Sequence, residues 1–162
     1  MIEEVLHPRV QELIRAHRED DPYHLQLALK GKTPVPAEWI VQQVQGYQKA
    51  RIKNSDWADC QGLVWPEPSL VEQSSSASTA KFKSSLMAGK VLIDLTGGLG
   101  VDAYHFSKVF EKVIFVDHHS DICAQARHNF KVLGAANIEV VHDTAEHFMA
   151  GYDASPATIY LD

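Results

Sequence analysis

The chain has 162 residues and lacks several features that would each define a class of protein. It has two cysteines, Cys60 and Cys123, which are too few for a disulfide framework, so both are expected to be small buried thiols. No apolar run approaches the roughly 18 residues of a membrane-spanning helix, and no basic-then-apolar leader begins the chain. We therefore expect a cytoplasmic protein that does not enter a membrane.

Positive charge is also scarce, since 15 Lys and Arg face 21 Asp and Glu and leave a formal net charge of -6. This balance argues against a protein that holds nucleic acid through its overall field. Three cations, Lys49, Arg51 and Lys53, end a predicted helix. They indicate either a solvated helix end, where cations suit the helix dipole, or a local patch that contacts RNA phosphates.

Signatures of metal sites and of hydrolases are missing as well. The chain has nine histidines, but they lie in different predicted elements without the spacing of paired metal ligands. The adjacent His118 and His119 are expected to point apart. No serine lies in a nucleophile-elbow pattern. The sequence thus predicts no metal site and no hydrolase chemistry.

The most informative stretch is residues 91–102, VLIDLTGGLGVD. An apolar run, Asp94, a glycine-rich turn and an amphipathic segment predict a strand, a tight loop and a helix, which is the ligand-holding corner of a doubly wound sheet. Glycines let the backbone turn sharply and let a ligand approach it. Because Gly98, Gly100 and Ala103 also satisfy the dinucleotide pattern G-x-G-x-x-A, the glycines alone do not identify the cofactor.

Asp94 discriminates between the cofactors. A carboxylate at the strand end would repel a pyrophosphate, whereas it would attract a sulfonium and an α-ammonium. S-adenosylmethionine carries both cations, so it is the cofactor that this corner favours. An NAD-dependent oxidoreductase is the alternative, with Asp94 as the feature against it.

The order of the acidic residue and the glycines resembles the first motif of class I S-adenosylmethionine-dependent methyltransferases, with Thr96 in place of the first glycine. The form DLTGGLGVDA is similar to RNA methyltransferases that make N2-methylguanosine. It is closer still to predicted bacterial methyltransferases with a C-terminal, RNA-binding THUMP-like domain, which share the segment EQSSS at residues 72–76. The resemblance covers residues 40 to 162 and implies methylation of a guanine exocyclic amine in an RNA substrate.

The resemblance implies a cofactor role for residues in three predicted strand ends. Asp94 would hold the ammonium side, and Gly98 and Gly100 would let the cofactor approach. Asp117, 23 positions after Asp94, would accept the two ribose hydroxyls. Asp143 would accept a hydrogen bond from the adenine amine, although residues 143–146, DTAE, also form a capping box for the next helix.

Two further groups complete the predicted site. Gln73, Ser74 and Ser75 would bond the carboxylate end of the cofactor if their segment packs over it, and otherwise they belong to a flexible serine-rich loop. Asp162 ends the last predicted strand, where the resembling families begin a D-P-x-x motif that holds the target amine. Asp162 is therefore the predicted catalytic residue, and with the rest of this motif missing we expect the chain alone to be nearly inactive.

These patterns predict an α/β protein in three parts: a helical region over 1–56, a connecting segment over 57–89, and the N-terminal half of a Rossmann-like sheet over 90–162. Strands are predicted at 90–95, 113–117, 138–143 and 157–162, in the order 3-2-1-4 if the crossovers are right-handed.

Strand four would then be an apolar edge. We expect the chain to be a fragment truncated after this strand, with the edge covered by the N-terminal helices or paired with a second copy in a homodimer. A further alternative is a methyltransferase-like interaction module that binds a partner through residues 49–53.

Overall fold

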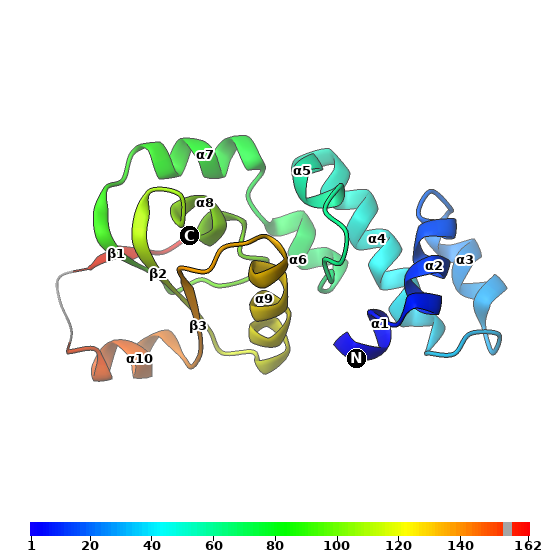
Figure 1. Cartoon of the computed structure of the whole chain (residues 1–162). Helices are drawn as coiled ribbons and strands as arrows, with labels where there is room; N and C mark the ends of the chain where they lie inside the picture. Colours follow the sequence, from blue (N-terminus) through cyan, green and yellow to red (C-terminus); the bar gives the residue numbers. More distant parts are fainter. Residues whose placement is uncertain (154–156) are drawn as a thin grey trace. The chain divides into compact units, whose positions relative to one another are not determined.

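The computed structural model describes residues 1–153 and 157–162. These residues form two compact units, Met1–Gln73 and Ser74–Asp162, whose helices and strands are labelled in Figure 1. The boundary falls inside the predicted connecting segment. Each unit has an apolar core of its own, so each is described by itself.

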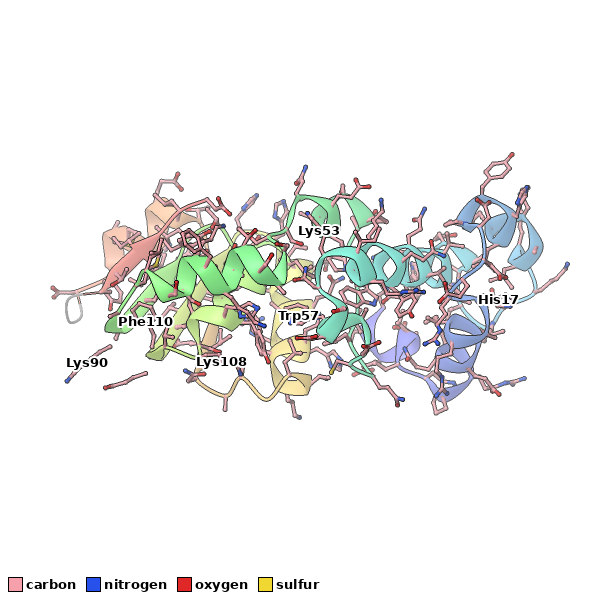
Figure 2. The ribbon with its side chains drawn as sticks, turned by 90° about the horizontal axis from the view of Figure 1, so that it is seen from above. His17, Lys53, Trp57, Lys90, Lys108 and Phe110 are labelled. Atoms are coloured by element: carbon pink, nitrogen blue, oxygen red, sulfur yellow. The ribbon has the colours of Figure 1, made fainter. Side chains whose placement is uncertain are left out.

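The described elements of the first unit are helices. They are α1 (Ile2–Val5), α2 (Pro8–His17), α3 (Pro22–Leu29), α4 (Ala37–Lys53), α5 (Ser55–Ala58) and α6 (Pro68–Gln73). Pro8 and Pro22 occupy first-turn positions, where the missing N–H costs nothing, and Asp21 caps α3 by accepting from the His24 N–H. In Figure 2, Lys53 marks the end of α4 and Trp57, which is buried, lies in α5.

Trp65 fixes the segment that follows α5 against α4. The buried Gln43 side chain accepts from the Trp65 N–H at 2.7 Å and donates to the Trp65 carbonyl at 2.9 Å. Gly46 lies directly beside this tryptophan, because a Cβ added there would lie 2.2 Å from Trp65 Cβ. The glycine inside α4 is therefore required by a close approach.

The second unit is a parallel four-stranded sheet with helices. Its strands are β1 (Gly89–Asp94), β2 (Phe110–Asp117), β3 (Ile138–His142) and β4 (Thr158–Tyr160), and its helices are α7 (Ala77–Ser85), α8 (Val101–Phe106), α9 (Ser120–Val132) and α10 (Ala145–Gly151). The strand order is β3-β2-β1-β4, which confirms the predicted Rossmann-like order 3-2-1-4. The strand bounds differ from the predicted ones by at most three residues, and at the end of β4 the regular pairing stops at Tyr160 and not at Asp162.

Strand β2 is buried on both faces, as its continuous apolar run predicts. On one face Val113 and Phe115 pack with residues of α8 and α9, and Phe110, which Figure 2 labels, belongs to the same cluster. On the other face Ile114 and Val116 pack with residues of α10. The sheet is thus the middle layer of the unit.

Parallel register brings the carboxyl ends of the strands to one edge. Asp94 is the Cα partner of Phe115 in β2 and of Tyr160 in β4, and Asp117 is the partner of His142 in β3. Ligands of open α/β sheets bind beyond this edge. The described residues contain no helix that combines the length and the apolar character needed to cross a membrane.

The Gly46 contact predicts an unusual response to a helix-favouring substitution. Gly46→Ala should gain about 1 kcal/mol of helix propensity but lose about 1–3 kcal/mol through overpacking against Trp65, for a net loss of stability. Urea unfolding followed by tryptophan fluorescence measures this change, since Trp39, Trp57 and Trp65 all lie in the first unit.

Gly151→Ala in α10 is the matched control, because a Cβ there would meet nothing within 4 Å. It should be neutral or stabilising when unfolding is followed by circular dichroism. A Gly46→Ala protein that is more stable than the parent would contradict the close approach.

Candidate functional site

Four acidic residues follow or end the four strands at their common edge: Asp94, Asp117, Asp143 and Asp162. Backbone bonds continue the sheet past the strands, since the Asp143 N–H donates to the Asp117 carbonyl at 3.1 Å and the Leu95 N–H donates to the Tyr160 carbonyl at 3.2 Å. The four carboxylates therefore come from neighbouring strand ends. The structure gathers the acidic positions that the sequence analysis selected.

The loop between β1 and α8 has three glycines in the left-handed region, Gly97 at φ 49°, Gly98 at φ 70° and Gly100 at φ 85°. Two of them also lie in close contacts. A Cβ at Gly97 would be 2.3 Å from Asp117 Oδ2, and one at Gly100 would be 2.6 Å from Phe130 Cζ. Gly98 and Gly100 are among the predicted site residues and Gly97 is not, although the adjacent glycine pair was a signal for it.

Asp94 lies beneath this loop and is 1% exposed. Its Oδ1 accepts from the Thr96 N–H at 3.0 Å and from the Thr96 hydroxyl at 2.8 Å. Burial raises the pKa of Asp94 to about 6, against the opposing effect of the Thr96 bonds. Asp94 thus shapes the loop from below, and Thr96 contributes a hydroxyl where the family motif has a glycine.

Asp117 connects the end of β2 to the glycine loop. Its Oδ2 accepts from the Gly98 N–H at 3.0 Å, and its Oδ1 accepts from the His119 N–H at 2.8 Å. Its side chain is 9% exposed. The predicted ribose-binding carboxylate therefore lies at the glycine loop, as that role requires.

The expectation that His118 and His119 point apart is wrong. Their ring centroids are 3.7 Å apart, because the chain turns after β2 and His119 Nδ1 lies 3.0 Å from Asp117 Oδ1. One ligand atom from each of Asp117, His118 and His119 lies within 4.8 Å of the others. Imidazole and carboxylate are ligands that divalent transition metals accept, and these three side chains converge instead of pointing apart.

Asp143 makes local contacts at the start of α10. Its oxygens lie 2.8 and 2.9 Å from His147 Nδ1, and its Oδ1 accepts from the Thr144 N–H. The hydrogen bond with His147 lowers the pKa of Asp143. The cap of α10 is Thr144, whose hydroxyl accepts from the His147 N–H, so the capping position lies one residue after the predicted one.

A polar cluster joins Ser75, Lys83, Asp102, Tyr160 and Asp162. Asp102 Oδ2 accepts from the Ser75 hydroxyl at 2.8 Å, and the Lys83 ammonium lies 2.7 Å from Asp162 Oδ2 and 2.5 Å from the Tyr160 hydroxyl. Of these residues, the sequence analysis selected only Ser75 and Asp162. Lys83, Asp102 and Tyr160 were missed, because nothing in a single sequence distinguishes a lysine in such a cluster from a solvated one.

The segment before α7 is divided between the units. Ser74 and Ser75 begin the second unit, and Ser75 lies in the polar cluster. Gln73 ends α6 and the first unit. The cofactor contacts of Gln73 and Ser74 stay predictions.

The cations that end α4 have partners within the first unit. Lys49 is paired with the Glu72 carboxylate, Lys53 donates to the Glu72 carbonyl, and Arg51 makes two bonds with Glu19 of 2.6 and 2.8 Å. These contacts favour the structural interpretation of the three charges over a patch that binds phosphates.

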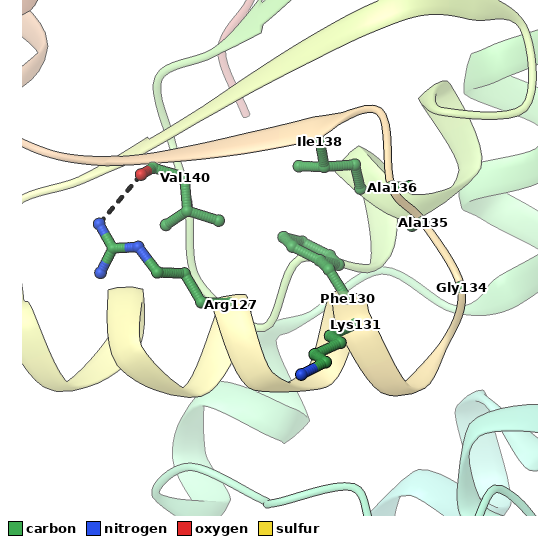
Figure 3. A pocket seen from close by; sticks show the side chains of 8 residues that line it. All are labelled: Arg127, Phe130, Lys131, Gly134, Ala135, Ala136, Ile138 and Val140. Carbon is green, nitrogen blue, oxygen red and sulfur yellow. Dashed lines mark hydrogen bonds between the residues drawn. The ribbon is translucent and has the colours of Figure 1, made fainter.

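A cavity of about 400 Å³ lies elsewhere in the second unit, between α9 and β3. Figure 3 shows its lining, in which Phe130 faces Ile138 and Val140, and Arg127 donates to the Val140 carbonyl. Its residues come from the last turns of α9, the loop that follows this helix and the first half of β3. The cavity is thus separate from the carboxyl ends of the strands.

The charges of the strand-end site fit a cation better than an anion. Asp94 is buried, and the charge of Asp102 raises its pKa further. Asp102 Oδ1 is buried and has no hydrogen-bond partner among the described residues. In the polar cluster a single ammonium faces the carboxylates of Asp102 and Asp162. A pyrophosphate would be repelled here, whereas a sulfonium or ammonium would be attracted.

The sheet order and the glycine loop are those of a Rossmann-like fold. A family model described as RNA cap guanine-N2 methyltransferase matches residues 89–156, which span β1 to the segment before β4. No curated protein sequence matches the chain.

A solved structure with the same fold is described as a "putative methyltransferase" from Porphyromonas gingivalis W83. It is 25% identical, with a TM-score of 0.72 over 91% of this chain, and the chain spans 37% of its length. The family match and this structure together support a methyltransferase.

Two streptococcal structures align over less of the chain. An rRNA methylase from Streptococcus thermophilus is 19% identical, with a TM-score of 0.41 over 47% of this chain and 46% of its own. A methyltransferase-like protein from Streptococcus mutans, solved in complex with SAH, is 24% identical, with a TM-score of 0.42 over 52% of this chain and 51% of its own. The fold assignment rests on the Porphyromonas structure.

The two adjacent glycines of the loop should differ in their tolerance of a side chain. Gly98→Ala should lower the free energy of unfolding by only about 1–2 kcal/mol, which is the cost of the left-handed conformation. No clash is added, because the space around a Cβ at this position is open. Gly97→Ala carries the same backbone cost and adds a clash with the Asp117 carboxylate. Thermal unfolding of both variants checks the order, and equal stabilities would contradict the close contact.

Burial of Asp94 predicts how stability depends on pH. The pKa of Asp94 is about 6 in the folded chain against 3.8 for the free side chain, so the folded state holds this proton more tightly. The protonated Asp94 therefore contributes about 3 kcal/mol to the free energy of unfolding. This contribution is complete below about pH 4 and is lost as the pH rises through 6.

Asp94→Asn keeps the oxygen that accepts from Thr96 and removes the ionisation. The free energy of unfolding of the variant, compared with that of the parent, should therefore rise between pH 4 and pH 7. A difference that is constant over this range would show that Asp94 does not titrate as described.

Proposed function

We propose that the chain is the cofactor-binding part of an S-adenosylmethionine-dependent methyltransferase that acts on a guanine exocyclic amine in RNA. The observation that carries the proposal is the contact between Asp117 and the glycine loop, 3.0 Å from Oδ2 to the Gly98 nitrogen. This contact holds the Asp117 carboxylate beside the glycine loop, which supports the proposed role of Asp117 as the acceptor of the ribose hydroxyls. The same segment matches a methyltransferase family model.

Each residue of the strand-end site has a specific task in this proposal. Asp117 accepts the two ribose hydroxyls while it keeps its bond to Gly98. Asp143 accepts from the adenine amine with the lone pairs that His147 leaves free. Asp94 contributes negative charge below the loop. Because Asp94 is buried and bonded to Thr96, a direct contact with the α-ammonium of the cofactor requires Thr96 to shift. Gly97, Gly98 and Gly100 keep the loop surface free of side chains.

The bound cofactor supplies an electrophilic methyl group on a sulfonium. Methyl transfer is a direct displacement, so the protein contributes mainly alignment and electrostatics. Asp162, which lies just after β4, accepts hydrogen bonds from the target amine, which leaves the nitrogen lone pair directed at the methyl group. Asp162 is an ionised acceptor at neutral pH, and its bond with Lys83 lowers its pKa below the ordinary value.

The RNA target is supported by the description of the matching family, in which a guanine N2 amine is methylated. The net charge of -6 and the internal partners of Lys49, Arg51 and Lys53 argue against RNA binding by the α4 end. We propose that RNA is bound by sequence outside this chain, such as the THUMP-like domain of the resembling proteins.

Calorimetric titration with S-adenosylhomocysteine tests the cofactor role. The parent chain should bind with micromolar affinity, and Asp117→Asn should bind about tenfold or more weakly, which corresponds to about 1.4 kcal/mol. Asp121→Asn, on the exposed first turn of α9, is the matched control and should leave the affinity unchanged.

Failure of the parent chain to bind would favour the alternative of an interaction module that has kept the fold and lost its cofactor. Equal affinities of the parent and the Asp117→Asn variant would instead remove Asp117 from the site.

A further inference from the structure

Lys83 lies on α7 and contacts four other side chains in the second unit. Its ammonium lies 2.9 Å from the Ser75 hydroxyl, 3.2 Å from Asp102 Oδ2 and 2.7 Å from Asp162 Oδ2. The fourth contact is with the Tyr160 hydroxyl at 2.5 Å. Residues of α7, α8 and β4 and of the loop before α7 thus meet at the Lys83 nitrogen.

The surroundings of Lys83 differ from those of a surface lysine. Its side chain is 21% exposed and that of Asp102 is 13% exposed. Burial lowers the pKa of Lys83, but its bonds with Asp162, Tyr160 and Asp102 outweigh this effect and raise it. Lys83 is therefore a permanent cation among acceptors, and such charge-assisted bonds are stronger and more directional than neutral ones.

Asp162 depends on this cation more than the other members do. Its side chain is 59% exposed, and Asp162 lies two residues after the last residue of β4, so no regular strand pairing fixes it. The groups that face it are Lys83 from α7 and the Tyr160 hydroxyl from β4, and the first is the larger cause of its lowered pKa. Asp102, from α8, is connected to Asp162 through the Lys83 ammonium, which contacts both carboxylates.

We propose that Lys83 is a positioning residue, which holds the carboxylate of Asp162 in a fixed place relative to α7 and Ser75. This inference rests on the proposed function, in which Asp162 accepts the hydrogens of the target amine. Through Lys83, the segment predicted to cover the cofactor is tied to the residue predicted to receive the substrate. The cofactor itself needs no contact with Lys83 in this arrangement.

The test is a titration of the Asp162 carboxyl group by carbon-13 NMR, with aspartate labelled and the signal assigned from its absence in Asp162→Asn. In Lys83→Met, which keeps the length of the side chain and removes the charge, the midpoint should move up toward the ordinary value for aspartate. Lys83→Arg should restore a low midpoint. Lys81→Met, on the same helix but exposed, should leave the midpoint as in the parent.

A midpoint that is the same in Lys83→Met and in the parent would overturn the proposal. If Lys83→Met does not fold, Lys83→Gln gives the same decision, because it also removes the charge while it keeps a donor. A merely structural role for Lys83 would alter stability without moving the Asp162 midpoint.

Calorimetry with S-adenosylhomocysteine separates this inference from the proposed function. Lys83→Met should bind within about threefold of the parent, since the ribose and adenine contacts lie at β2 and β3. If the parent binds no S-adenosylhomocysteine, the cofactor role fails, and the NMR titration still decides whether Lys83 positions Asp162.

Discussion

The carboxylate of Asp117 connects the two loops that form the candidate site. One oxygen accepts from the Gly98 N–H and the other from the His119 N–H, so one side chain fixes the turn after β1 and the turn after β2. Gly97 has to be a glycine because its backbone lies against this carboxylate. The Asp117 carboxylate therefore determines the shape of the loop, the ends of two strands and the proposed ribose contact.

Negative charge at the strand ends is the second constraint. Parallel pairing places Asp94, Asp117, Asp143 and Asp162 along one edge, and like charges at an edge are unfavourable unless they are bonded or neutralised. The chain bonds Asp94 to Thr96, Asp143 to His147, and Asp162 to Lys83. What remains is an edge that favours cations and hydroxyl donors over phosphates. This preference is the physical basis for an adenosyl sulfonium ligand.

Much of the second unit could be predicted from the sequence, because its signals are local. The apolar run of β2, the loop glycines and the alternation of strands and helices specify the sheet order, and the acidic strand ends follow from it. Gly97 was missed because a glycine pattern counts spacings and does not show which position lies against a side chain. The His118 and His119 rings converge because their backbone turns toward Asp117, a local geometry that residue types do not specify.

Contacts between distant parts of the sequence explain the other omissions. Lys83 and Tyr160 are 77 positions apart, and Gln43 and Trp65 are 22 apart. Neither pair has a spacing that a periodic pattern would reveal. The need for a glycine at position 46 of α4 has the same origin, since its partner Trp65 is remote in sequence.

The central claim is that the strand-end carboxylates select an adenosyl ligand without phosphates. The most direct measurement is a calorimetric comparison of S-adenosylhomocysteine and NAD as ligands of the parent chain. Both carry an adenosine whose ribose diol can reach Asp117, but NAD brings a pyrophosphate to the loop above Asp94. The account predicts micromolar binding of S-adenosylhomocysteine and no detectable binding of NAD; NAD binding of equal or greater affinity would contradict it.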